Sequence, residues 1–250
     1  MTILEIQNLT KVYNNTNNSD AIINNLSLSV DSNEFLCILG PSGCGKSTLL
    51  RCIAGFEKYS GKILVNDIET SVPSPNRIMV FQDYNQLFPW KTVEKNIQFP
   101  LKVCGIKDKK QLQKLSNNAL KMVHLSSYAK YYPHQLSGGM KQRVAIAKAL
   151  VQKPEIILMD EPFAALDAIS RRNLQSELSD ISQKETCTFI FVTHNIQEAI
   201  TLGKRIIVMN KSGEIITDIR NNLKRPITPS SEGYGIMWEI LKDSLNENTN

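Results

Sequence analysis

The stretch Gly40-Pro41-Ser42-Gly43-Cys44-Gly45-Lys46-Ser47-Thr48 decides the fold of this 250-residue chain. It fits the pattern G-x-x-x-x-G-K-[ST] of a phosphate-binding loop. Apolar residues 35–39 precede it and predict a buried strand, and residues 48–54 follow it with a helical pattern. A strand, a glycine-rich loop and a helix in this order are the context that the motif needs. The alternative, a glycine-rich turn that happens to precede a lysine, fits this context poorly.

The chemistry of the loop follows from its residue types. The glycines let the backbone curl so that several N–H groups point at one anion, and the helix N-terminus adds partial positive charge. Lys46 can then reach the β- and γ-phosphates of a nucleotide, and the Ser47 hydroxyl can ligate Mg²⁺. Because Cys44 lies close to Lys46 and to a helix N-terminus, we expect its thiol pKa to be lowered.

Composition excludes several classes of protein. The chain is 42% hydrophobic and 21% charged, as is typical of a globular protein. A net charge of +5 is too diffuse to indicate a nucleic-acid partner, and we expect none. We see no apolar run of the ~18–20 residues that a membrane span needs, and no signal peptide. Five scattered cysteines and three scattered histidines suggest free thiols and no metal-binding spacing.

The N-terminal part of the chain reads as short strands. Residues 4–9 and 26–30 alternate in polarity and predict an antiparallel layer beside the loop. Tyr13 lies between them, either as an aromatic platform for a nucleotide base or as an aromatic half-buried at a strand end. Residues 77–81 predict a further strand that ends in Gln82. That glutamine is either a ligand of Mg²⁺ or water near the phosphates, or an ordinary polar strand terminus.

Residues 87–150 are predicted to be helical, with helices at about 93–99, 109–125 and 138–151, and form an inserted subdomain. The segment opens with an apolar cluster of Leu87, Phe88 and Trp90, which we expect to be exposed. Near its end, Ser137-Gly138-Gly139 begins the last helix. Ser137 is a good N-cap, and the two glycines indicate a close approach to the backbone, although a simple capped helix is the alternative. Lys148 is expected to point outward.

The C-terminal half supplies two acidic residues and a histidine at predicted strand ends. Residues 156–159 form an apolar strand that ends in Asp160 and Glu161, and residues 188–193 form another that ends in His194. An aspartate in this position of a nucleotide-binding fold holds Mg²⁺, and two adjacent carboxylates favour a nearby cation. Helices are expected at 170–183 and 196–202 and a strand at 205–209. The polar tail from residue 221 contains one short amphipathic stretch at 236–241.

The whole series of motifs resembles the ATP-binding subunit of ABC transporters. It runs from the loop at 40–48 through Gln82, residues 136–142, Asp160-Glu161 and Asp167 to His194, in the order and spacing of that family. The resemblance covers nearly the whole chain. It implies an α/β fold, namely a P-loop NTPase (RecA-like) core with an N-terminal antiparallel β layer and an inserted α-helical subdomain. It also implies an ATPase domain over residues 1–220 and a short tail over 221–250.

The resemblance also implies roles for individual residues. Glu161 would polarise the attacking water, His194 would hold the γ-phosphate, and Gln82 would sense Mg²⁺ and that water. Tyr13 would stack on adenine, the nine loop residues would hold the phosphates, and Asp160, Ser47 and Gln82 would hold Mg²⁺. The residues implied to contact ATP or the opposite subunit across a head-to-tail homodimer are Ser137, Gly138, Gly139 and Asp167.

Finer similarity points to one branch of the family. Val80-Phe81-Gln82 and residues 87–93 resemble importers of nitrate, sulfonate, taurine and similar small anions. The implied partners are a transmembrane permease and, through it, an extracytoplasmic solute-binding protein, with the subunit on the cytoplasmic face of the membrane. Asn195 departs from the pattern, because an aspartate usually follows the histidine. Other importer classes, an ABC ATPase of DNA repair or translation, and a regulatory module without turnover are the alternatives.

Overall fold

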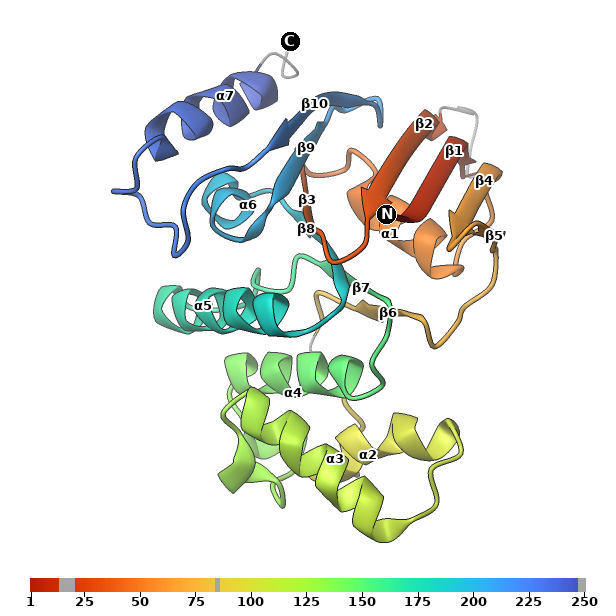
Figure 1. Ribbon diagram of the computed structural model, residues 1–250, viewed down its shortest axis with the longest axis vertical. Coiled ribbons are helices and arrows are strands. Elements are labelled where there is room, and N and C mark those ends of the chain that lie inside the picture. The colour runs from red at the N-terminus through yellow and green to blue at the C-terminus, as the bar shows by residue number, and fades with distance from the viewer. Residues whose placement is uncertain (14–20, 84–85, 247–250) are drawn as a thin grey trace.

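The computed structural model describes residues 1–13, 21–83 and 86–246, and within them two sheets and a group of helices (Figure 1). The first sheet is antiparallel, with the strand order β2-β1-β4-β5. Its strands are β1 (Thr2–Val12), β2 (Ala21–Asp31), β4 (Ser60–Val65) and β5 (Ile68–Glu69). The predicted N-terminal antiparallel layer is therefore present.

The second sheet has the strand order β10-β9-β3-β8-β7-β6 and is parallel except at β10, which pairs antiparallel with β9. Its strands are β3 (Phe35–Leu39), β6 (Arg77–Val80), β7 (Ile156–Asp160), β8 (Thr188–Thr193), β9 (Arg205–Met209) and β10 (Ile215–Arg220). The carboxyl ends of β3, β6, β7 and β8 lie together at one edge of this sheet.

The register fixes what lies at that edge. Leu39 pairs with Thr193, Asp160 pairs with Val192, and Val80 pairs with Met159. The residues that follow these strands therefore emerge side by side, and they include most of the predicted phosphate-site residues.

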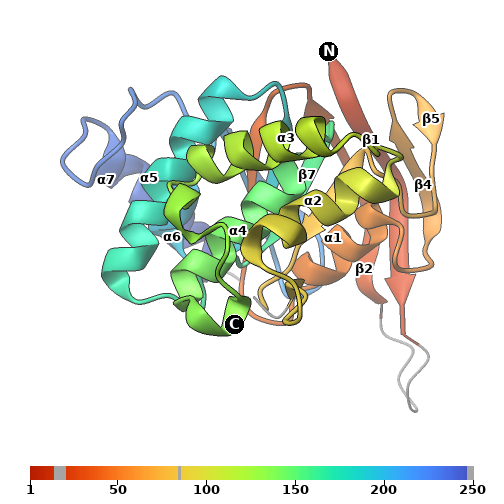
Figure 2. The ribbon, with the colours of Figure 1, turned by 90° about the horizontal axis from the view of Figure 1, so that it is seen from below.

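The helices cover the sheets and extend the molecule below them (Figure 1). They are α1 (Lys46–Ala54), α2 (Val93–Val103), α3 (Lys109–Met122), α4 (Gly138–Leu150), α5 (Ala168–Lys184), α6 (Ile196–Leu202) and α7 (Tyr234–Asn246), with short 3₁₀ turns at Ser126–Tyr128 and Pro133–Gln135. Helices α2, α3 and α4 pack against one another and form the helical insertion (Figure 2). The predicted fold class is confirmed.

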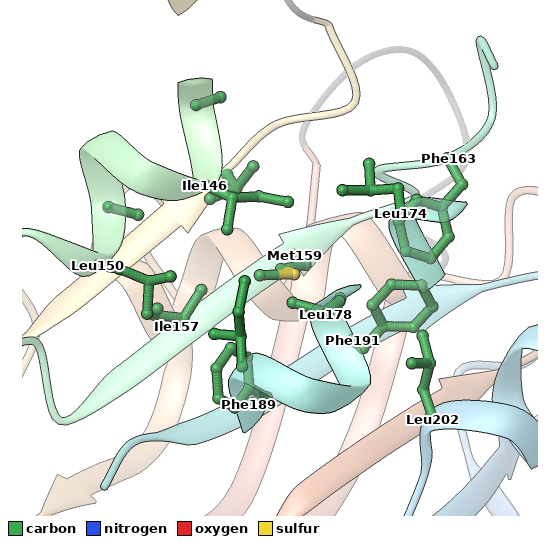
Figure 3. Packing of buried hydrophobic residues seen from close by; sticks show 14 of the residues in the cluster. Ile146, Leu150, Ile157, Met159, Phe163, Leu174, Leu178, Phe189, Phe191 and Leu202 are labelled. Atoms are coloured by element: carbon green, nitrogen blue, oxygen red, sulfur yellow. The ribbon is translucent and has the colours of Figure 1, made fainter. Parts of the chain in front are cut away.

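Alternate residues of the parallel strands sort into two cores, as expected for a sheet covered on both faces. Phe189 and Phe191 of β8 face the helices, where they pack with Leu174 and Leu178 of α5 (Figure 3). Ile190 of β8 lies in the other core, between the two sheets and α1. Since α1 begins in the phosphate-binding loop, this second core fixes the loop against both sheets.

Several predicted boundaries differ from the structure, among them those of α2, α3 and α7. Helix α2 continues through Pro100 to Val103 instead of ending at Phe99, and the Pro100 carbonyl accepts a hydrogen bond from Cys104 N at 2.9 Å. Helix α3 ends at Met122, because His124 adopts a left-handed backbone with φ 56°. The tail helix α7 is longer than the predicted stretch 236–241, since its neighbours also pack on the core.

Candidate functional site

The loop between β3 and α1 depends on glycine for its backbone conformation. Gly43 and Gly45 take φ values of 83° and 96°, which glycine adopts without strain. The N-cap residue of α1 is Gly45, which has no side chain to cap the helix, so a phosphate could bind the first N–H groups. A Cβ on Gly45 would lie 2.8 Å from the Ile22 carbonyl oxygen, and one on Gly40 would lie 2.7 Å from that of Met209. The neighbouring backbones therefore require glycine at both positions.

Lys46 is buried in this loop and aims its ammonium group at backbone carbonyls. Lys46 Nζ donates to Gly40 O at 2.8 Å and to Pro41 O at 2.7 Å. Its side chain thus curls back over the loop, and its ammonium group could bind an anion there.

The expectation of a lowered Cys44 pKa is wrong. The Cys44 side chain is buried, and burial raises its thiol pKa more than Lys46, whose Nζ lies 3.8 Å from the sulfur, lowers it. The positive charge of Lys46 is visible in the sequence, but the burial of the Cys44 thiol is not. Cys44 belongs to the loop as predicted, but the pKa of its thiol is raised and not lowered.

Ser47 and Asp160 meet although 113 positions separate them. Ser47 Oγ donates a hydrogen bond to Asp160 Oδ1 at 2.7 Å. Burial is the main cause that raises the pKa of the Asp160 carboxyl, and Glu161 adds to it, while the hydrogen bond from Ser47 opposes the shift. A hydroxyl and a carboxylate oxygen in contact are hard ligands of the kind that Mg²⁺ prefers.

The described residues contain no group of three or more His, Cys, Asp or Glu side chains that would hold a metal by themselves. A magnesium ion usually takes one or two protein oxygens and completes its shell with phosphates and water. The donor set at Ser47 and Asp160 therefore fits Mg²⁺ that is bound together with a nucleotide.

Glu161 and His194 contact each other at the same sheet edge. His194 Nδ1 lies 2.9 Å from Glu161 Oε2, and the His194 side chain is largely exposed. Glu161 has a left-handed backbone with φ 42°, which is costly for a residue with a Cβ. The edge therefore holds a carboxylate and an imidazole in a position that the chain maintains at an energetic cost.

A buried network lies directly beneath His194. Thr193 Oγ1 donates to Glu198 Oε2 at 2.6 Å and accepts from Asn195 N at 3.0 Å. Burial raises the pKa of the Glu198 carboxyl. On its other side, Arg171 lies 3.9 Å from Glu198 Oε1 and donates to the Leu166 carbonyl at 3.1 Å. The network ties the turn after β8 to the segment before α5.

Asn195 keeps a structural role in spite of its departure from the family pattern. Its Oδ1 accepts from Glu198 N at 3.3 Å and caps the N-terminus of α6. The cap needs an oxygen acceptor and no charge, so asparagine serves the helix without adding a negative charge beside His194.

Gln82 lies at the same edge, two residues beyond Val80, and is exposed. Val80 pairs with Met159, so the register places Gln82 level with Glu161. The two readings from the sequence, a ligand of Mg²⁺ or water and a polar strand terminus, are both compatible with this position.

Tyr13 is half-buried at the end of β1 and lies against a charged pair. The Lys11 ammonium lies 4.3 Å from the centre of its ring and 2.9 Å from Glu57 Oε2. Hydrogen bonds from Lys11 and Tyr13 lower the pKa of the Glu57 carboxyl. One side of the ring is thus supported by a buried lysine.

Ser137, Gly138 and Gly139 begin α4 in the helical insertion. Ser137 Oγ accepts from Met140 N at 3.3 Å, so the predicted N-cap is present. A Cβ on Gly139 would lie 3.4 Å from Ser170 Cβ of α5. Within the described residues, no hydrogen bond or ion pair joins this segment to the phosphate-binding loop.

Asp167 is exposed and caps α5. Its Oδ1 accepts from Ile169 N at 3.1 Å and from Ser170 N at 3.0 Å. A hydrogen bond from the Ser170 side chain is the main cause that lowers the pKa of its carboxyl, and the N–H groups of Ser170 and Ile169 add to the shift. The sequence pointed to a contact with another subunit and did not show this role as a helix cap.

The apolar cluster after Gln82 is not exposed as a whole. Leu87 is buried in the core, Phe88 is half-buried and Trp90 is 70% exposed. Lys148 was expected to point outward, but it is half-buried, donates to Gln86 O at 3.1 Å and lies 4.7 Å above the Phe88 ring. The loop therefore rests on a lysine of α4 and presents its tryptophan to the outside.

Sequence reasoning missed several residues around the site, namely Lys11, Glu57, Arg171, Thr193 and Glu198. Glu198 follows His194 by four positions, one helical turn, and this spacing is the one signal that was available. The partners of Lys11 and Arg171 are distant in sequence and carry no local signal.

Known proteins resemble the chain over almost its whole length. Residues 23–164 match the family model described as ABC transporter. The uncharacterized ABC transporter ATP-binding protein MJ0412 of Methanocaldococcus jannaschii is 47% identical over 97% of this chain and 92% of its own length. The aliphatic sulfonates import ATP-binding protein SsuB of Bacillus cereus is 41% identical over 98% of this chain and 95% of its own.

A solved structure shows the same fold. The dimeric post-hydrolysis state of the ATP-binding cassette MJ0796, bound to ADP and Pi, has a TM-score of 0.77 and 32% identity, and it covers 88% of this chain and 99% of that one. In residues 1–13, 21–83 and 86–246, no helix is long and apolar enough to span a membrane.

Proposed function

Since this chain belongs to the ABC transporter family and is an ATPase of that family, we propose that it energises the import of a small anion. The sulfonate import protein of Bacillus cereus, which matches nearly the whole chain, supports this solute class. The likeness of residues 80–82 and 87–93 to importers of nitrate, sulfonate and taurine supports it as well. We place the ATPase domain at residues 1–220 and a short tail at 221–250.

ATP would bind with its phosphates in the loop at 40–48. The loop's N–H groups and the N-terminus of α1 would hold the β-phosphate, and Lys46 would turn from its carbonyl partners toward the β- and γ-phosphates. Tyr13, supported from one side by Lys11, would offer its other face to adenine. The loop at 40–48 would thus hold the phosphates, and the end of β1 would hold the adenine.

Mg²⁺ would be held by the Ser47 hydroxyl and the Asp160 carboxylate, with Gln82 nearby. When bound, it neutralises the charge that develops on the transferred phosphoryl group. The hydrogen bond between Ser47 and Asp160 would keep the two ligand oxygens close together before the ion binds.

Hydrolysis would be carried out at the pair of Glu161 and His194. Glu161 would take a proton from the attacking water or polarise it, and the imidazole would donate to the γ-phosphate. The 2.9 Å contact between Nδ1 and Oε2 is the observation that carries this proposal, because it brings a carboxylate and an imidazole together at one sheet edge beside the loop. The network of Thr193, Glu198 and Arg171 would hold the histidine turn in place.

The site would be completed by a second copy of the chain in a head-to-tail dimer. Ser137, Gly138 and Gly139 of one copy would close on the γ-phosphate held by the loop of the other, and Asp167 would contact the opposite subunit. The MJ0796 cassette, which has the same fold, was solved as a dimer, and this supports the proposal. The exposed Trp90 would contact a transmembrane permease from the cytoplasmic side, and the permease would receive the solute from an extracytoplasmic binding protein.

Uptake by reconstituted vesicles tests this function. The subunit is assembled with its permease in proteoliposomes, its solute-binding protein is added, and uptake of labelled taurine, nitrate and putrescine is followed with ATP inside. We expect ATP-dependent uptake of taurine or nitrate and none of putrescine. Uptake of putrescine alone would show a different solute class, and hydrolysis without any uptake would contradict the role in import.

A further inference from the structure

A pocket of about 680 Å³ lies between α5, α6 and the segment that leads to α7, apart from the proposed nucleotide site. Figure 1 shows this segment running from β10 past α6 before it reaches α7. Its volume is within the range of small-molecule sites. The side chains of Arg172 and Gln175 enter it from α5, Thr201 from α6, and Arg225 and Ile227 from the tail.

Gln175 supplies the pocket with an amide that is free to pair with a ligand. Its side chain is only 7% exposed and lines the pocket, yet its amide makes no hydrogen bond with any described residue. A buried amide without a partner costs about 1–3 kcal/mol, so buried polar groups are nearly always satisfied by protein, water or a ligand. The Gln175 amide therefore opens into the pocket, where water or a ligand can pair with it.

The charges in the pocket favour an anion. Arg225 is half-buried and Arg172 is exposed, and neither forms an ion pair with any described carboxylate. Arg225 directs Nη1 at Thr201 O and Nη2 at Leu202 O, each at 2.7 Å, so neutral carbonyls hold its charge in place without cancelling it. Asp180 is the single carboxylate that lines the pocket among the described residues, and it is exposed.

The remaining wall favours an organic ligand over a bare ion. Pro226, Ile227 and Pro229 line the tail side and offer apolar surface beside the two guanidinium groups. An oxyanion could accept hydrogen bonds from the Gln175 amide and the arginines while its carbon chain covers the prolines.

The pocket is connected to the reaction site through α6. Arg225 and Asn221 both donate to carbonyls at the C-terminus of α6, where Asn221 Nδ2 reaches Ile200 O at 2.7 Å. The N-terminus of the same seven-residue helix is capped by Asn195, the residue after His194. A ligand that pulls on Arg225 would therefore act on a short rigid element that begins at the histidine turn.

We propose that this pocket binds a small organic oxyanion, such as a sulfonate or carboxylate, and that its occupancy controls the rate of ATP hydrolysis through α6. The proposal does not depend on which solute is transported. It differs from the proposed nucleotide site in place and in residues.

Calorimetric titration of the full chain with ethanesulfonate, butyrate and butylammonium tests the binding. Saturating ADP is present, so that the phosphate-binding loop is blocked, and ionic strength is constant. We expect ethanesulfonate or butyrate to bind, butylammonium not to bind, and Gln175→Leu to weaken the anion at least tenfold. Arg172→Gln should also weaken it, while Gln111→Leu, an exposed glutamine on α3, serves as the matched control.

Folding and turnover complete the test. Gln175→Leu replaces an amide that makes no hydrogen bond with any described residue, so its melting temperature without ligand should equal or exceed that of the wild type. The bound anion should change the ATPase rate of the wild type at least twofold and leave that of Gln175→Leu unchanged. No binding of either anion, or equal binding by Gln175→Leu, would overturn the site. Binding without any change in rate would overturn the control of hydrolysis.

Discussion

His194 Nδ1 lies 2.9 Å from Glu161 Oε2, so the two side chains that we assign to the γ-phosphate contact each other directly. Replacing Glu161 by glutamine keeps the shape of this contact and removes the base. We expect Glu161→Gln to bind ATP while its turnover falls ~10²–10⁴-fold, the usual contribution of a general base. An ATP-bound dimer should also persist, as sedimentation would show.

The matched control for this variant is Glu155→Gln, at the opposite end of β7. Glu155 Oε2 accepts a hydrogen bond from Asn66 Nδ2 at 2.8 Å and is far from the proposed site along the strand. Its turnover should stay near that of the wild type. Near-normal turnover of Glu161→Gln would show that the base lies elsewhere.

Lys46→Ala should bind ATP weakly and hydrolyse none, because the ammonium group that faces the loop is lost. Equilibrium binding of a fluorescent ATP analogue measures the affinity. Lys62→Ala, which removes an exposed lysine from β4, should leave the affinity unchanged. An unaltered affinity in Lys46→Ala would contradict the assignment of the loop.

Cys44 should react slowly with iodoacetamide at pH 7, because burial raises its pKa and the thiolate is the reactive form. Below the raised pKa, the rate should increase ~tenfold per pH unit, so labelling accelerates through pH 8 and 9. The background Cys104→Ser removes the exposed cysteine. Mg-ATP should slow the labelling of Cys44, which mass spectrometry measures. Fast labelling at pH 7, or labelling at the same rate with and without nucleotide, would contradict this prediction.

Trp90 and Leu87 belong to one loop but should respond differently to truncation. Trp90→Ala should leave the free energy of unfolding within ~1 kcal/mol of the wild type, because the side chain is 70% exposed, while Leu87→Ala should cost about 2–5 kcal/mol. Transport and permease assembly should fail in Trp90→Ala.

Fluorescence of a Trp238→Phe background, which leaves Trp90 as the only indole, provides the binding measurement. Its emission should shift when permease is added. If Trp90→Ala unfolds the free subunit, or permease leaves the emission unchanged, the proposed contact is wrong.

The parallel-sheet edge could be predicted because each of its polar residues directly follows an apolar strand. Once the strands at 35–39, 156–160 and 188–193 are parallel, Ser47, Asp160 and His194 must approach one another, whatever lies between them. Local patterns therefore suffice for this part of the site.

The features of the site that could not be predicted depend on how deeply side chains are buried. Burial in turn depends on packing between segments that are distant in sequence. Cys44 looked activated because its charged neighbour is visible in sequence, whereas its burial is not. Lys148 looked exposed by helical spacing, but the loop at 86–88 folds over it. Gln175 and Arg225 show no motif at all, and their pocket exists only because the tail returns to α6.

Glu161 has a left-handed backbone with φ 42°, so the stability of the fold and the hydrolysis of ATP favour different residues at this position. Asparagine tolerates this conformation better than glutamate, so Glu161→Asn should raise the free energy of unfolding by up to ~1 kcal/mol while turnover is lost. Chemical denaturation compared with an ATPase assay checks both effects, and a variant that is less stable would contradict them. A library selected for heat resistance alone should therefore enrich inactive enzymes at position 161.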